Sequence, residues 1–115
     1  MIILSPLKAL DALVPDWIAV PQSEYGKQFW DKNSIKKNQD GSIRVLSKFV
    51  PTSTTDITQD ILYTMDIKCS ESFFKDVAVG SKEWNEFENK DSEWKDHNND
   101  KLISGVINQV CAYSN

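Results

Sequence analysis

A single histidine among carboxylates is the feature of this sequence with the most direct capacity for chemistry. His97 lies in the polar segment 96–100, which also contains two aspartates. A histidine beside carboxylates can act as a general base or as a metal ligand. The surrounding residues, however, are typical of a solvated loop that leads into a helix. We therefore interpret His97 as a loop residue and expect neither a metal nor a cofactor.

Calcium binding and acid–base catalysis are the other two kinds of chemistry that the acidic residues suggest. Asp96, Asn98 and Asp100 space their oxygen atoms as calcium loops do, but the central glycine and the closing glutamate of such loops are missing. Glycosidase-type catalysis needs two carboxylates across a cleft, one of them with a raised pKa. The acidic residues between 83 and 100 are instead mixed with lysines, as on a solvated surface, and they include Glu86, Glu88, Asp91 and Glu93.

Motifs for other enzyme classes are missing too. The sequence has no Gly-x-Ser-x-Gly motif, no glycine-rich phosphate-binding loop and no second histidine. We therefore predict no catalytic residue and no enzyme. The alternative that stays open is a small secreted enzyme, or an enzyme inhibitor, with its site in the acidic loop before the C-terminal helix.

Length and charge narrow the classes of protein further. The chain has 115 residues and a formal charge of −4, from 13 Lys and Arg against 17 Asp and Glu. Binding to nucleic acid needs clustered cations, and crossing a bilayer needs about 20 consecutive apolar residues. We therefore expect no nucleic-acid partner and no membrane span. The length fits one domain, 16–114, preceded by residues 1–15, which are either a flexible extension or the remnant of a signal peptide.

Alternation of apolar and polar residues predicts an antiparallel sheet of about five to six strands. The clearest strand, 61–69, places Tyr63, Met65, Ile67 and Cys69 on one face. Proline, glycine and polar segments separate it from its neighbours, as in a sheet joined by turns and loops. The predicted strands are 16–20, 27–31, 42–50, 61–69 and 73–79.

The C-terminal segment predicts one amphipathic helix over 100–111. Asn98 or Asn99 is expected to cap its N-terminus, with Asp100 in the first turn. The helix would cover the apolar face of the sheet, which gives an α+β fold of two layers. The apolar stripe of the helix consists of Leu102, Ile103, Val106, Ile107 and Val110.

The two cysteines lie at the ends of the predicted strand 61–69 and of the predicted C-terminal helix. Cys69 ends a strand whose apolar face points inward, and Cys111 continues the inward stripe of the helix. They are too far apart for a CxxC redox motif, so they form either one disulfide or two separate thiols of a cytosolic protein. A bridge would close a loop of about 43 residues and contribute about 4 kcal/mol. Because both cysteines face the same interface, we predict a Cys69–Cys111 disulfide that tethers the helix to the sheet.

Tryptophan is the one residue type with an unusual count. The four are Trp17, Trp30, Trp84 and Trp94. Exposed aromatic rings can stack on a sugar or a peptide, whereas buried rings pack the core. We expect core packing for most of them, with Trp30 and Trp84 the most exposed. The segment 81–96 fits either a strand or a helix, and we favour a short strand followed by a polar loop.

The sheet face that the helix leaves uncovered is the predicted binding surface. A face or an edge of a sheet can accept a peptide strand or a protein patch. The mixed signs of the charges on this face favour a protein partner over a polyanion. The residues of the predicted binding face are Arg44, Lys48, Thr64, Asp66 and Lys68.

The order of these features resembles the surface-adhesin protein E family of bacterial exported proteins. The likeness is carried by Trp17, by Asp-Lys-Asn-Ser-Ile at 31–35, by the strand 43–48, by Asp-Ile-Lys-Cys at 66–69, by Trp94 and by Val-Cys-Ala-Tyr at 110–113. It implies a curved antiparallel sheet, a C-terminal helix pinned by a disulfide, and export to the periplasm or the cell surface. The family takes its name from members that bind host matrix proteins. The resemblance therefore implies a non-catalytic exported protein that binds a protein partner, and we expect a monomer or a weak homodimer.

Overall fold

Antiparallel strands form a single sheet in the part of the chain that the structure describes. The computed structural model describes residues 14–53, 59–80 and 93–114. Within these residues six strands pair in the order β1-β2-β4-β5-β6, with β3 paired to β4. The strands are β1 (Trp17–Ala19), β2 (Gly26–Asp31), β3 (Lys36–Lys37), β4 (Ile43–Pro51), β5 (Ile61–Lys68) and β6 (Phe73–Val79). The predicted antiparallel sheet is confirmed.

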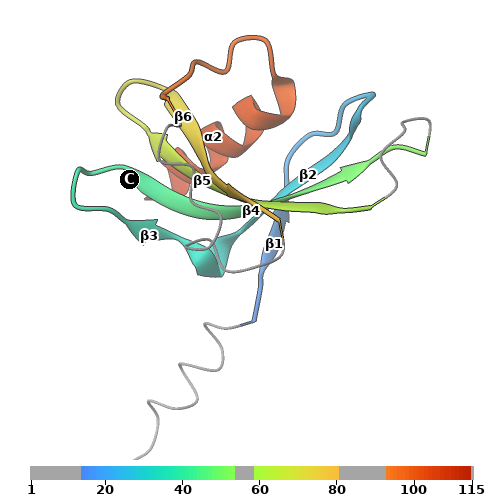
Figure 1. The fold of residues 1–115 in the computed structure, drawn as a ribbon, viewed down its shortest axis with the longest axis horizontal. Coiled ribbons are helices and arrows are strands. Elements are labelled where there is room, and N and C mark those ends of the chain that lie inside the picture. Colours follow the sequence, from blue (N-terminus) through green and yellow to red (C-terminus); the bar gives the residue numbers. More distant parts are fainter. Residues whose placement is uncertain (1–13, 54–58, 81–92, 115) are drawn as a thin grey trace, which may run out of the picture.

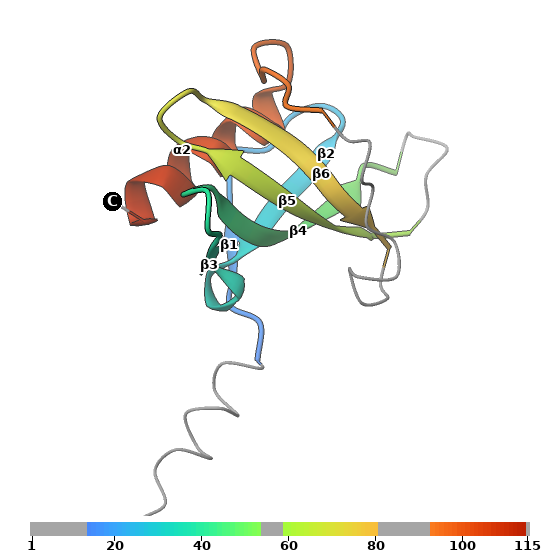
Figure 2. The same cartoon turned by 60° about the vertical axis from the view of Figure 1, so that its left-hand side comes forward.

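One helix packs on one face of this sheet. The α-helix α2 (Lys101–Ser114) crosses the strands on the same side in both Figure 1 and Figure 2, and the sheet curves around it. A short 3-10 helix, η1 (Lys32–Ser34), connects β2 to β3. The predicted α+β fold of a sheet covered by a C-terminal helix is confirmed.

The hydrophobic core fills the space between α2 and the sheet. Val45, Met65 and Ile67 are completely buried, and all five residues of the predicted helix stripe are buried with them. Burying an aliphatic side chain of this size contributes about 1.5–3 kcal/mol. The buried sheet residues of the core are Trp30, Ile43, Val45, Met65, Ile67 and Phe74.

Trp30 was expected, with Trp84, to be the most exposed of the tryptophans, and this prediction is wrong. Its side chain is only 3% exposed. The indole Nε1 donates a hydrogen bond to Oε1 of Gln109 at 2.7 Å, and Nε2 of Gln109 donates to the carbonyl oxygen of Ala19 at 3.3 Å. The helix thus supplies the polar partner that a buried indole needs. Trp84 lies outside the described residues.

The N-terminal cap of the helix lies later in the sequence than predicted. Asp100, and not Asn98 or Asn99, is the N-terminal cap, because its Oδ1 accepts a hydrogen bond from the backbone N–H of Ile103 at 3.0 Å. The carbonyl oxygen of Asp100 also accepts the first helical hydrogen bond, from the N–H of Ser104 at 2.9 Å.

Some predictions concern segments outside the described residues. These segments are 1–13, 54–58 and 81–92. The N-terminal extension or signal remnant over 1–15 falls largely among them, and so does most of the segment 81–96. The assignment of 16–114 to a single domain stays a prediction.

Gly105 lies where the helix approaches Val20, in the chain after β1. A Cβ atom added to Gly105 would lie 2.9 Å from Cβ of Val20, which is itself buried. At an exposed helix position, glycine to alanine stabilises by about 1 kcal/mol. Here we expect Gly105→Ala to lower the free energy of unfolding by about 1–3 kcal/mol, because the Val20 Cβ cannot rotate away.

Urea denaturation measures this effect. Asn108→Ala is the matched control, since Asn108 is an exposed position of the same helix and alanine there should be neutral or slightly stabilising. A Gly105→Ala variant as stable as the control would show that the helix moves to make room.

Candidate functional site

The five residues predicted to form a binding face lie on the side of the sheet opposite α2. Arg44 and Asp66 are direct cross-strand neighbours on β4 and β5. Arg44 donates from Nε and Nη2 to the two carboxylate oxygens of Asp66, at 2.8 and 3.0 Å. Thr64 is 9% exposed and Asp66 is 4% exposed, so a partner does not reach them directly. The partly exposed members of the face are Arg44, Lys48 and Lys68, and a binding role for them stays a prediction.

A cluster of aromatic rings surrounds Lys48 at one end of this face. The Nζ atom of Lys48 lies 4.5 Å from the centre of the Trp17 ring and 5.2 Å from the centre of the Phe29 ring. An ammonium group at this range is attracted by the negative face of the ring. Trp17 therefore lies against a lysine on the outer side of the sheet, which the sequence did not indicate.

A second lysine–tryptophan cluster lies at the other end of the face. The Nζ atoms of Lys68 and Lys75 lie 4.4 and 4.7 Å from the centre of the Trp94 ring. Lys75 is the cross-strand neighbour of Asp66 on β6. Glu71 also approaches Lys68, with 3.9 Å between its Oε2 atom and Nζ. Lys75 and Trp94 were not predicted as members of this surface, although the alternation in β6 places Lys75 on it.

The predicted disulfide joins Cys69, the residue after β5, to Cys111 in the last turn of α2. The Cα atoms of Cys69 and Cys111 lie 5.6 Å apart, and both residues pack against the core. The bridge holds the C-terminal half of the helix against the sheet. The Cys69–Cys111 prediction is confirmed.

His97 lies in the turn before the helix. Its Nδ1 atom lies 2.6 Å from Oγ of Ser104, and the Ser104 hydroxyl donates to the carbonyl oxygen of His97 at 3.0 Å. These contacts tie the turn to the first turn of α2. Within the described residues, no three His, Cys, Asp or Glu side chains lie close enough to hold a metal ion. The carboxylate of Asp96 accepts a hydrogen bond from the N–H of Asn98 at 3.3 Å.

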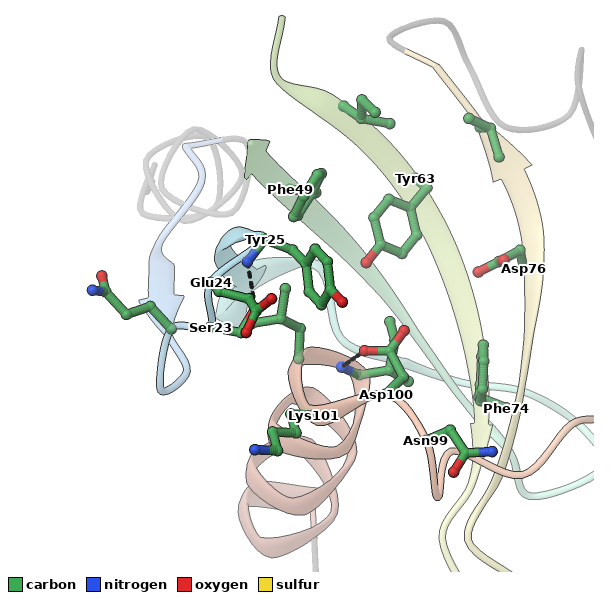
Figure 3. Close-up of a pocket in the computed structure, with 15 residues that line it drawn as sticks. Ser23, Glu24, Tyr25, Phe49, Tyr63, Phe74, Asp76, Asn99, Asp100 and Lys101 are labelled. Carbon is green, nitrogen blue, oxygen red and sulfur yellow. Dashed lines mark hydrogen bonds between the residues drawn. The ribbon is translucent and has the colours of Figure 1, made fainter. Parts of the chain in front are cut away.

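A cleft that the sequence analysis did not identify opens between the N-terminal end of α2 and the sheet. Its volume is about 780 Å³. Figure 3 shows the side chains of Tyr63, Asp76 and Asp100 directed into the space between the strands and the helix. Loop residues 22–25 form the wall opposite β6. The apolar lining residues are Phe49, Ile61, Phe74, Val79, Leu102 and Ile103.

Tyr63 lines this cleft and is held in place by a hydrogen bond. Its hydroxyl oxygen accepts a hydrogen bond from Nε2 of Gln28, a side chain that is only 2% exposed. Burial raises the pKa of Tyr63 strongly, so the hydroxyl stays protonated. The cleft therefore contains a neutral phenol group, which the hydrogen bond from Gln28 holds in position.

Asp76 is the second polar group of the cleft, and one of its carboxylate oxygens lacks a hydrogen bond within the part of the chain that the structure describes. Among the described residues, its Oδ1 atom is buried and has no hydrogen-bond partner. Burial raises the pKa of the Asp76 carboxyl, the Asp100 carboxylate adds to the rise, and Lys95 opposes it. An unpaired carboxylate oxygen of this kind destabilises the folded state.

Asp76 should make stability depend on pH. Its pKa is higher in the folded than in the unfolded protein, so the folded state loses stability as the pH rises from the unfolded pKa through the folded one. We expect Asp76→Asn to be more stable than the parent by about 1 kcal/mol at pH 7. The difference should disappear below the unfolded-state pKa of about 3.9.

Urea denaturation at a series of pH values tests this expectation. Asp16→Asn changes the same charge at an exposed position and should show no such pH-dependent gain. An Asp76→Asn variant less stable than the parent at pH 7 would contradict the assignment.

Comparison with known proteins gives one match. The model of the surface adhesin-E family matches residues 18–115. The comparisons with curated proteins and with solved structures found no match. Within the described residues, no helix has the length and apolar character that a membrane span requires. Because the family match covers the sheet from Ile18 onward, the helix and both cysteines, this chain belongs to the surface adhesin-E family.

Proposed function

We propose that this protein is a non-catalytic exported binding protein that holds a protein partner on the predicted binding face of its sheet. Membership of the surface adhesin-E family indicates an adhesin-like, non-enzymatic role and an exported or cell-surface location. The proposal adds a periplasmic or cell-surface site of action and a monomer or weak homodimer as the binding form. The Cys69–Cys111 disulfide supports export, because such bonds persist in oxidising compartments.

The observation that carries the proposal is the pairing of lysines with aromatic rings on this face. Lys48 and Lys68 each place an ammonium group within 4.5 Å of a tryptophan ring centre. A lysine on a ring presents charge and apolar area together, and aromatic residues supply much of the binding energy at protein interfaces. Between the two clusters, the Arg44–Asp66 pair is fixed by two hydrogen bonds. A surface fixed in this way loses little entropy when a partner binds.

The charges of the face indicate what the partner presents. Asp66 neutralises Arg44 and the exposed Glu71 offsets part of the charge of Lys68, so the lysines carry the remaining positive charge. A protein patch with carboxylates beside apolar side chains would complement both the ammonium groups and the rings. This chemistry fits a protein surface better than an extended polyanion, because the lysines lie at two separate ends of the face.

Binding to immobilised extracellular-matrix proteins, measured by biolayer interferometry, tests the proposal. We expect the parent protein to bind at least one of them. Reversing two charges in Lys48→Glu/Lys68→Glu should weaken that binding by about tenfold or more, since each rim charge contributes to attraction and encounter. The affinity of the parent should also fall as salt is raised.

Lys37→Glu is the matched control. Lys37 is exposed and pairs with Ile43, a residue of the core under the helix, so it lies on the other side of the sheet and receives one reversal of the same kind. It should leave the affinity unchanged. Equal losses in the control and the double variant, or no binding by the parent to any of these proteins, would refute the proposed use of this face.

A further inference from the structure

Most of the charged side chains that line the cleft beside the N-terminus of α2 are negative. Glu24, Asp76 and Asp100 contribute carboxylates, and Lys101 contributes the single ammonium group among the described residues that line it. Figure 3 shows Lys101 directed away from Asp76 and Asp100. The interior of the cleft therefore attracts a cation. It lies on the helix side of the sheet, so it takes no part in the proposed binding face.

Two of these carboxylates, those of Asp76 and Asp100, differ in the hydrogen bonds that they accept within the protein. Asp100 caps the helix, because its Oδ1 accepts from the N–H of Ile103 at 3.0 Å. Asp76 has a buried Oδ1 with no partner among the described residues. Lys95, the cation that acts on Asp76, is exposed at the edge of β6 and does not line the cleft. Because the Asp76 carboxylate lines the cleft, a cationic N–H donor that enters the cleft can pair with it in a charge-assisted hydrogen bond.

The walls of the cleft suit an aliphatic chain. Phe74 and Leu102 are buried members of the core that also line the cleft. At its rim, Tyr25 is 65% and Val79 is 56% exposed, although both are large apolar side chains. Long basic side chains pack their methylene groups on such surfaces while their charged end reaches a polar partner.

We propose that this cleft binds a lysine or arginine side chain of a protein partner, with its cationic end on Asp76 and its methylene groups against Phe74 and Leu102. The cleft volume of about 780 Å³ exceeds that of one side chain, so the backbone on either side of the basic residue also fits. Tyr25 and Val79 at the rim contact that flanking chain. The positive end of the helix does not repel the cation, because Asp100 already caps it.

Titration of the isotope-labelled protein with short blocked peptides, followed by NMR, tests the proposal. The probe is Ac-Gly-Ser-Lys-Ser-Gly-NH2, and the comparison peptide has norleucine in place of lysine. We expect the lysine peptide to shift the amide signals of Tyr63, Phe74 and Leu102, with an affinity about tenfold higher than that of the norleucine peptide. Equal affinities for the two peptides, or no shifts with either, would overturn the proposal.

Variants of the cleft and of the sheet separate this inference from the proposed function. Asp76→Asn should weaken binding of the lysine peptide by about tenfold, whereas Asp16→Asn should not change it. Lys48→Glu/Lys68→Glu should leave peptide binding intact, because those lysines lie on the opposite face. Unchanged binding by Asp76→Asn would overturn the proposal. A free diamine, cadaverine, that binds as tightly as the peptide would show that the cleft recognises an amine and not a protein side chain.

Discussion

Replacing Cys69 or Cys111 by alanine is expected to lower the free energy of unfolding by about 2–5 kcal/mol while the fold is retained. The disulfide joins residues 42 positions apart, and a loop of this size restricts the unfolded chain by about 4 kcal/mol. Small domains are stable by only about 5–15 kcal/mol in total. Urea denaturation should therefore show a clear loss, and the melting temperature should fall by roughly 10–20 °C.

Reduction of the parent protein provides an independent check on the same bond. The parent in dithiothreitol should match the Cys69→Ala/Cys111→Ala double variant, because both lack the crosslink. Ser70→Ala, at the exposed residue next to Cys69, should change the free energy of unfolding by less than about 0.5 kcal/mol. If reduction left the melting temperature unchanged, the bridge would not restrict the unfolded chain as argued.

The sheet and the helix could be predicted because burial leaves a periodic pattern in each. Val45 and Met65 are completely buried and are cross-strand neighbours, as the alternation in their strands requires. Val106 and Val110 are completely buried at helical spacing. The disulfide could be predicted for the same reason, since each cysteine continues one of these inward patterns.

Trp30 shows where local patterns fail. Its indole is buried because Gln109 accepts its hydrogen bond, and these two residues are 79 positions apart. No pattern within β2 reveals that partner. The burial of Thr64 and Asp66 was missed for a related reason. β5 is an interior strand with β4 and β6 on either side, and its place in the strand order is not visible in the sequence.

The cleft could not be predicted because it depends on an irregularity in strand pairing. The ladder between β5 and β6 shifts so that Met65 pairs with Asp76 and Thr64 pairs with Ala78, which leaves Val77 as an extra residue. Such a bulge inverts the alternation beyond it. The sequence alone therefore does not tell which side of β6 its last residues face. The carboxylate of Asp76 acquires its role only when the helix N-terminus closes over that side of the sheet.

Replacing Ile107 by alanine is the other change with a large expected effect, a loss of about 2–5 kcal/mol in the free energy of unfolding. Ile107 is 2% exposed, in the middle of the stripe that packs on the sheet. The helix cannot move inward to fill the space, because the Cys69–Cys111 bridge fixes one end. Urea denaturation measures the loss, with the exposed neighbour Asn108→Ala as the control. A loss below about 0.5 kcal/mol would mean that the helix is docked loosely, and Leu102 could then not form the wall of the cleft.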